Sequence, residues 1–302
     1  MNYIAVILNI FIAILLVRLF SKPDRETFFN PFVSFTNSRV TRLVDFLKPA
    51  LALPEKTTMG IILLFVFLFK TLLLSKMAHT VSINFGEVFR VVPPDSMSEH
   101  ISLLYFSFLE TISFMLKFWS FYFLTILVKS PGKSTRALQA LGYYAKPFSL
   151  PPLRFQILLL VVSHIALAFL AIQSGELVSI SVSTGSVQTI SDPVTGSPMI
   201  IGFIKTAWIG LLSVCEGISV MISVLFTFII GSLITTLMRR MDFALLCREG
   251  MDMVLGRFSR SQTPQAGLDF TPLIFFFVAS ISYNTVNFAI FSLVNTDLTL
   301  PF

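Results

Sequence analysis

The stretch FFNPFVSFTNSRVTRLVDFLKPALALP, residues 28–54, separates two strongly apolar segments of a 302-residue chain. The segment before it covers residues 3–20, and the segment after it contains GIILLFVFLF at residues 60–69. Within residues 28–54, apolar side chains such as Val40 and Val44 recur at helical spacing, with polar and basic side chains opposite them. A basic amphipathic helix of this kind lies in the headgroup plane of a membrane. We therefore expect the chain to leave the membrane core, rest along the interface and re-enter.

The composition extends this pattern to the whole chain. Hydrophobic residues make up 55% and charged residues 13%, whereas soluble domains have about 25% charged residues. Crossing about 30 Å of hydrocarbon requires roughly 20 apolar residues. Six segments are candidates, at residues 3–20, 59–78, 101–128, 155–173, 207–237 and 272–294. They predict an all-α membrane protein with about six transmembrane helices. The first segment has no basic residue before its apolar core and ends near Arg18, so we expect a retained helix rather than a cleaved signal peptide.

Positive charge is concentrated in alternate connections. Sixteen of the 22 Lys and Arg residues lie in residues 21–56, 129–154 and 239–260. The positive-inside rule places these connections in the cytoplasm and both termini on the opposite side. We expect a multi-pass protein of the bacterial inner membrane, with an organellar membrane as the alternative. The basic residues expected to contact anionic lipid headgroups include Arg39, Arg42, Arg136, Arg248 and Arg257. Since membrane topology explains the excess of basic over acidic residues, no nucleic-acid partner is expected.

The order of apolar helix, basic amphipathic segment and apolar helix occurs three times. ETISFMLKF, starting at Glu110, and EGISVMISV, starting at Glu216, share Glu, Ile, Ser and Met at the same offsets. The sequence therefore predicts three repeat units packed as one domain. The units are residues 1–78, 101–173 and 201–302, joined by connections 79–100 and 174–200. The second connection alternates Val and Ile with Ser and Thr between turn residues, which predicts a small extracytoplasmic β-hairpin.

Two short motifs carry a resemblance to a known family. Asn30, Pro31 and Phe32 open the first amphipathic segment and Pro49 closes it, while GLDFTP at residues 267–272 opens the last predicted helix. This arrangement resembles the YggT (YlmG-like) family of integral membrane proteins. The middle unit keeps AKPFSLP but has neither motif. The resemblance implies a role in membrane organisation, such as division or nucleoid placement, osmotic tolerance, or cofactor assembly into membrane complexes. It implies no catalytic residues.

The second motif also has a physical interpretation of its own. Thr271 is predicted to cap a helix whose first position is Pro272, where the missing N–H costs nothing. Asp269 lies near the positive end of that helix and is expected to pair with an arginine of the amphipathic segment. Gly267 completes the motif of the resembled family.

A rise of about 1.5 Å per residue gives the depth of each polar residue along its predicted helix. Four polar residues on four predicted helices fall in one layer near mid-membrane: Asn9, Lys117, His164 and Asn284. Glu110 and Glu216 fall near the outer interface, so neither need be a buried charge, and Lys70 is expected to extend outward. Two interpretations of the layer remain open. The residues form hydrogen bonds that specify helix packing, or they line a polar cavity for an ion, proton or small substrate around Lys117 and His164.

Enzyme motifs are missing from the sequence. It contains no His-Glu-x-x-His, no paired intramembrane aspartates and no Gly-rich phosphate loop. Cys215 and Cys247 are too few and too scattered for a disulfide framework or a metal site. We expect no enzymatic activity, no metal and no cofactor. The favoured function is a non-enzymatic scaffold, assembly factor or accessory subunit of a membrane-protein complex. The alternative is a small channel or transporter using the layer around Lys117 and His164.

Overall fold

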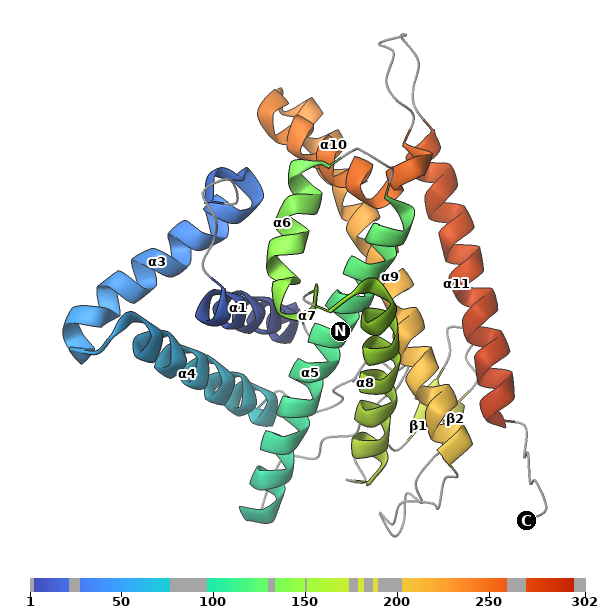
Figure 1. The fold of residues 1–302 in the computed structure, drawn as a ribbon, viewed down its shortest axis with the longest axis horizontal. Coiled ribbons are helices and arrows are strands. Elements are labelled where there is room, and N and C mark those ends of the chain that lie inside the picture. Colours follow the sequence, from blue (N-terminus) through green and yellow to red (C-terminus); the bar gives the residue numbers. More distant parts are fainter. Residues whose placement is uncertain are drawn as a thin grey trace.

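The computed structural model describes residues 3–21, 28–76, 97–129, 134–149, 151–173, 179–181, 187–189, 203–259 and 270–295. Within them the fold is dominated by helices (Figure 1). The helices are α1 (Tyr3–Phe20), α3 (Pro31–Leu51), α4 (Glu55–Lys76), α5 (Met97–Val128), α6 (Arg136–Tyr144), α7 (Lys146–Ser149), α8 (Leu153–Gln173), α9 (Phe203–Leu237), α10 (Met241–Leu255), the 3₁₀ turn η1 (Gly256–Phe258) and α11 (Thr271–Asn295). The predicted helical character is therefore confirmed.

Five helices are long and apolar enough to cross a membrane. Their apolar stretches are Glu55–Leu73 in α4, Leu103–Val128 in α5, Leu153–Ala171 in α8, Thr206–Leu237 in α9 and Thr271–Leu293 in α11. The sixth predicted span also forms a helix, α1, but its apolar part, Val6–Phe20, is shorter than the roughly 20 residues a span requires. Its last turn is engaged by α3, because Arg18 donates hydrogen bonds to Asn37 O at 3.0 Å and Thr41 Oγ1 at 2.8 Å. The prediction of six spans is thus confirmed for five.

The long helices form a bundle with α1, α3 and α4 at one side (Figure 1). Helix α9 packs against α5, α8, α10 and α11, while α1 packs chiefly against α4. In Figure 1, α6 and α10 lie at the end of the bundle where α5 and α9 finish, and α3 and α4 form a V beside it. In chain order, each amphipathic region follows one apolar helix and precedes another. The equivalence of the three units, and the boundaries between them, stay predictions.

Helix α5 is the centre of the bundle and α11 is its edge. In α5, 56% of the apolar stretch is buried inside the protein, against 11% in α11. Phe106, Leu109 and Trp119 of α5 are buried in the largest hydrophobic cluster, together with Ile209 and Leu225 of α9. A helix buried on several sides needs apolar residues around most of its circumference. This explains why α5 is rich in large apolar residues along its whole length.

Two glycines allow α9 to approach its neighbours closely. A Cβ added at Gly210 would lie 2.7 Å from the Cα of Ile165 in α8, and one at Gly217 would lie 2.5 Å from the Cβ of Ser120 in α5. Small residues of this kind let helix backbones approach each other in membranes. The crossings of α9 with α5 and α8 therefore depend on glycine at these positions.

A hydrogen-bond chain joins the amphipathic helices α3, α6 and α10. Asn30 is the N-cap of α3, where its side chain accepts from Phe32 N–H at 3.1 Å. The same side chain donates through Nδ2 to Arg136 O, at the start of α6, at 2.7 Å. The Arg136 guanidinium in turn pairs with Glu249 of α10, with Nε 3.0 and 3.1 Å from the two carboxylate oxygens. Helix α6 thus contacts both α3 and α10 and links the three predicted interfacial segments.

Two short strands form in the connection before α9. β1 (Ser179–Ser181) pairs antiparallel with β2 (Val187–Thr189), with Ile180 opposite Gln188. The residues that join them lie outside the described residues. The complete β-hairpin, and its location outside the cytoplasm, stay predictions.

We predict that Gly210→Ala destabilises the protein by about 1–3 kcal/mol, because the new methyl group meets the backbone of Ile165, which cannot move aside easily. The matched control is Gly60→Ala in α4, where no atom lies within 4 Å of the added Cβ. Thermal unfolding in detergent should show a lower midpoint for the first variant only. Equal midpoints for the two variants would contradict this account of the α8–α9 crossing.

Candidate functional site

The structure separates the four residues of the predicted polar layer. Asn9 lies in a cluster around Lys70. Lys117 and His164 lie near each other, and Ser120 is hydrogen-bonded to His164. Asn284 is exposed on α11, and Asn287, one turn further on, is buried instead. The four residues therefore do not form one cluster, because equal depth along four helices does not make their side chains face the same point. Their common depth near mid-membrane stays a prediction.

Lys70 is the best-enclosed charge among the described residues, with a side chain that is 0% exposed. Its ammonium donates to Asn9 Oδ1 of α1 and Thr111 Oγ1 of α5, both at 2.8 Å, and to Ser107 O at 3.1 Å. The Glu110 carboxylate completes the site with its Oε2 2.8 Å from Nζ. One lysine of α4 is thus surrounded by oxygen atoms from two other helices.

This geometry corrects two predictions. Lys70 does not extend outward, and Glu110, which was expected not to need burial, is largely buried, 12% exposed. The depth of Glu110 near the outer interface stays a prediction. Burying either charge alone is costly, whereas a paired and hydrogen-bonded charge is tolerated. The sequence did contain a signal for this pairing. A lysine inside one apolar span and a glutamate inside another are expected to form an ion pair. The pairing was missed because the rotation of α4 about its axis is set by packing.

The second cluster lies between α5 and α8. His164 is fully buried, and its Nε2 lies 3.2 Å from Ser120 Oγ. Lys117 is also buried, precedes Ser120 by one helical turn, and lies near enough to His164 for its charge to act on the ring. The predicted proximity of Lys117 and His164 is thus observed, whereas its functional meaning stays a prediction.

The third cluster joins α9 to α11. Tyr283 donates to Glu216 Oε1 at 2.6 Å. Glu216 and Asn287 are both buried. The expectation that Glu216 need not be a buried charge is therefore wrong, whereas its depth near the outer interface stays a prediction. The expectation failed because Tyr283 comes from a helix 67 residues away in the chain, and no local pattern shows that contact.

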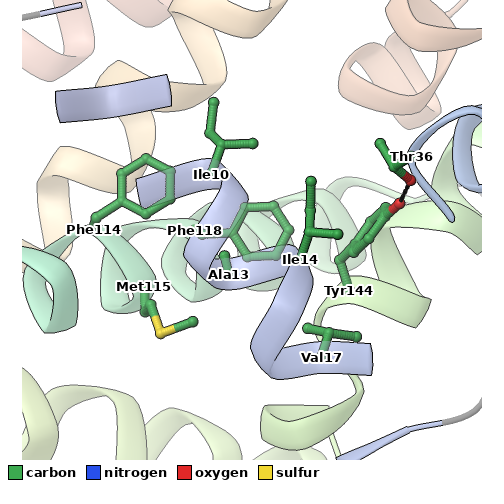
Figure 2. A pocket seen from close by; sticks show the side chains of 9 residues that line it. All are labelled: Ile10, Ala13, Ile14, Val17, Thr36, Phe114, Met115, Phe118 and Tyr144. Atoms are coloured by element: carbon green, nitrogen blue, oxygen red, sulfur yellow. Dashed lines mark hydrogen bonds between the residues drawn. The ribbon is translucent and has the colours of Figure 1, made fainter. Parts of the chain in front are cut away.

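An apolar pocket of about 200 Å³ lies beside the Lys70 cluster, between α1 and α5 (Figure 2). Its lining residues are Ile10, Ala13, Ile14, Val17, Thr36, Phe114, Met115, Phe118 and Tyr144. The hydroxyls of Thr36 and Tyr144 meet at one end, where Figure 2 shows them hydrogen-bonded. Burial raises the pKa of the Tyr144 phenol above its usual value. The pocket was not predicted, because it forms only where α1 and α3 meet α5 and α6.

The described residues of the two short motifs lie at or near the ends of α3 and α11. Pro31 occupies the first turn of α3 and Pro49 lies inside that helix near its end, while Phe32 packs against the core. Helix α11 begins at Thr271, and Phe270 O accepts from Ile274 N–H at 3.0 Å.

Phe270 therefore precedes the helix, and the predicted capping position of Thr271 is wrong by one residue, whereas Pro272 does lie in the first turn. Gly267 and Asp269 lie outside the described residues.

The predicted interfacial arginines are all exposed, but two of them bind protein groups. Arg136 pairs with Glu249, which raises the pKa of the guanidinium above its usual value. Arg257 donates to Leu127 O at the end of α5 at 2.8 Å. Arg39 lies over the ring of Phe35, 5.5 Å from its centroid. No group of three or more His, Cys, Asp or Glu side chains within the described ranges is arranged to hold a metal ion.

Comparison with protein-family models, with curated proteins and with solved structures found no match to this chain. What the fold defines is a helical protein with five helices able to cross a membrane. The resemblance to the YggT family stays a prediction.

We predict that Lys70→Met destabilises the protein by about 3–5 kcal/mol, because it leaves the Glu110 carboxylate buried without its counter-charge. The double variant Lys70→Met/Glu110→Gln should recover most of the loss. Thermal unfolding in detergent measures both. The control is Lys56→Met, at an exposed position of the same helix. A Lys70→Met protein as stable as this control would show that the ion pair does not hold α4 to α5.

Proposed function

We propose that this chain is a non-enzymatic integral membrane scaffold or accessory subunit that docks another membrane protein through the outer face of α11. The observation that carries the proposal is the composition of this face. It exposes Ser282, Thr285 and Ala289 in the middle of an apolar stretch that is only 11% buried. Large apolar side chains, including Phe277 and Phe288, flank them.

Such a face suits a partner helix better than lipid alone. Helices in membranes associate through small residues that allow close approach and through hydroxyl groups that form hydrogen bonds across the contact. The Thr285 hydroxyl donates to Ile281 O within its own helix at 2.9 Å. Its oxygen still has a lone pair with which to accept from a neighbouring helix. The flanking phenylalanines supply the apolar contact area.

The buried charges support a structural role. Lys70 is bound by Asn9, Thr111, Ser107 and Glu110, and Glu216 accepts from Tyr283. Side chains held by several protein partners are suited to fixing helices rather than to exchanging ions with solvent. This favours a scaffold over an enzyme or a carrier.

The finer points of topology belong to the same proposal. We place the protein in a bacterial inner membrane, with its three basic connections in the cytoplasm and both termini outside. The location of α6 and α10 at one end of the bundle supports this arrangement (Figure 1). The exposed side chains of Arg42 and Arg248 are available to anionic headgroups there. Three repeat units and a role in assembling a membrane complex, as the YggT resemblance implies, complete the proposal.

We predict that a photoreactive benzoylphenylalanine at Phe277 or Phe288 of α11 cross-links one membrane protein in native membranes. The same probe at Phe65 of α4, which is at least as exposed, should not. Quantitative mass spectrometry should recover the adduct at a fixed ratio to the bait. Equal adducts from both helices, adducts with a second copy of this chain only, or none at all would contradict the scaffold proposal.

The Lys117–Ser120–His164 cluster favours a second candidate, a small channel or transporter. It combines a lysine and a histidine, both buried inside helices able to cross a membrane. Ionisable groups in such positions often mark ion or proton pathways. The competing interpretation is that the cluster specifies the packing of α5 on α8.

We predict for this second candidate that Lys117→Met abolishes proton or cation flux through proteoliposomes while the protein still folds. Lys117→Arg, which keeps the charge, should retain part of the flux. Fluorescent dyes inside the vesicles measure both. Unchanged flux in Lys117→Met, or no flux in the unmodified protein, would leave the cluster with a packing role only.

A further inference from the structure

The apolar pocket between α1 and α5 is polar at one end only. Ile10 and Val17 mark its length along α1, and seven residues span about 10 Å of helix. Thr36 of α3 and Tyr144 of α6 line one end, where their hydroxyls are paired (Figure 2) and both residues are only half-buried. Ile10 lies towards the other end, which is lined by apolar side chains only. This polarity matches a linear amphiphile.

The size of the pocket suits an apolar chain rather than water. A site of about 200 Å³ exceeds the roughly 150 Å³ of an apolar cavity that stays dry and binds benzene. The walls offer only aliphatic, aromatic and thioether groups apart from the two hydroxyls. Those hydroxyls already bond to each other, and a buried water needs two to four polar partners.

The helix at the polar end carries the charge that an anionic headgroup needs. On α3, Arg39 follows Thr36 by about one turn, and Arg42 follows Arg39 by another. Both arginines are exposed, alongside the exposed rings of Phe35 and Phe46. Aromatic rings next to arginines are typical of side chains at the headgroup level. Val40 and Val44, on the opposite face, pack inward.

We propose that this pocket binds a segment of one acyl chain of an anionic phospholipid whose headgroup lies against Arg39 and Arg42 of α3. The chain enters at the Thr36–Tyr144 end and lies along Ile14, Ala13 and Ile10 of α1. It fills the space between the first helix and the central helix α5. The site is independent of α11 and of the scaffold proposal.

The first experiment needs no variant. The protein is reconstituted with phosphatidylglycerol carrying a diazirine on its acyl chain, washed in mild detergent, irradiated and digested. Retained lipid should form adducts on the peptides of α1 and α5 that line the pocket. Phosphatidylcholine with the same diazirine should be retained less. Adducts confined to other helices, or no lipid retained after the wash, would overturn the proposal.

The second experiment fills the pocket. Ala13→Phe places a ring in the cavity, and Ala13→Leu does so with less volume if the larger side chain prevents folding. Native mass spectrometry of the washed protein should show one phospholipid fewer per chain than in the unmodified protein. The control is Ala166→Phe, at an exposed position of α8, which should keep the lipid. Unchanged lipid retention with a raised melting temperature would show an empty cavity and overturn the proposal.

The headgroup is tested separately. The double variant Arg39→Gln/Arg42→Gln should lose the preference for phosphatidylglycerol over phosphatidylcholine while the total lipid retained through the wash changes little. Equal preference in the variant and the unmodified protein would refute the assignment of the headgroup to α3.

Discussion

The buried ammonium of Lys70 imposes a constraint on the whole first third of the chain. An ionised group inside an apolar bundle must find its partners within the protein, and Lys70 finds oxygen atoms on α1 and α5. The hydrogen bonds from Lys70 to these oxygen atoms fix the rotation of α4 about its axis. They also hold α1 against the central helix α5. The pocket lies between α1 and α5, which are held near each other. It stays open because the small side chain of Ala13 does not fill the space between these helices.

The molecule then presents two different outer faces. On one side, α3 exposes arginines and phenylalanines beside the apolar pocket. On the other side of the central helices, α11 exposes small and hydroxyl-bearing residues between large apolar ones (Figure 1). The first composition suits lipid headgroups and chains, whereas the second suits another helix. A subunit that orders lipid on one side and binds a protein on the other is consistent with both faces.

Sequence reasoning succeeded where the cause is local. The apolar length of the spans, the periodicity of the amphipathic segments and the first-turn proline of α3 each depend on a few neighbouring residues. It failed for Lys70, Glu110 and Glu216, each of which turned out to be buried and partnered. Depth along a helix follows from a fixed rise per residue. The direction in which a side chain points depends on how that helix is rotated against its neighbours.

The sequence by itself determined that the chain is helical, that most of its apolar segments are long enough to cross a membrane, and that amphipathic stretches separate them. Only the tertiary structure decided which face of each helix turns inward. The Lys70–Ser107 and Thr36–Tyr144 contacts join residues 37 and 108 positions apart. Such contacts form only after helix crossings are set by close approaches such as that of Gly210 to Ile165. The polar clusters and the apolar pocket are therefore products of packing, which no single segment encodes.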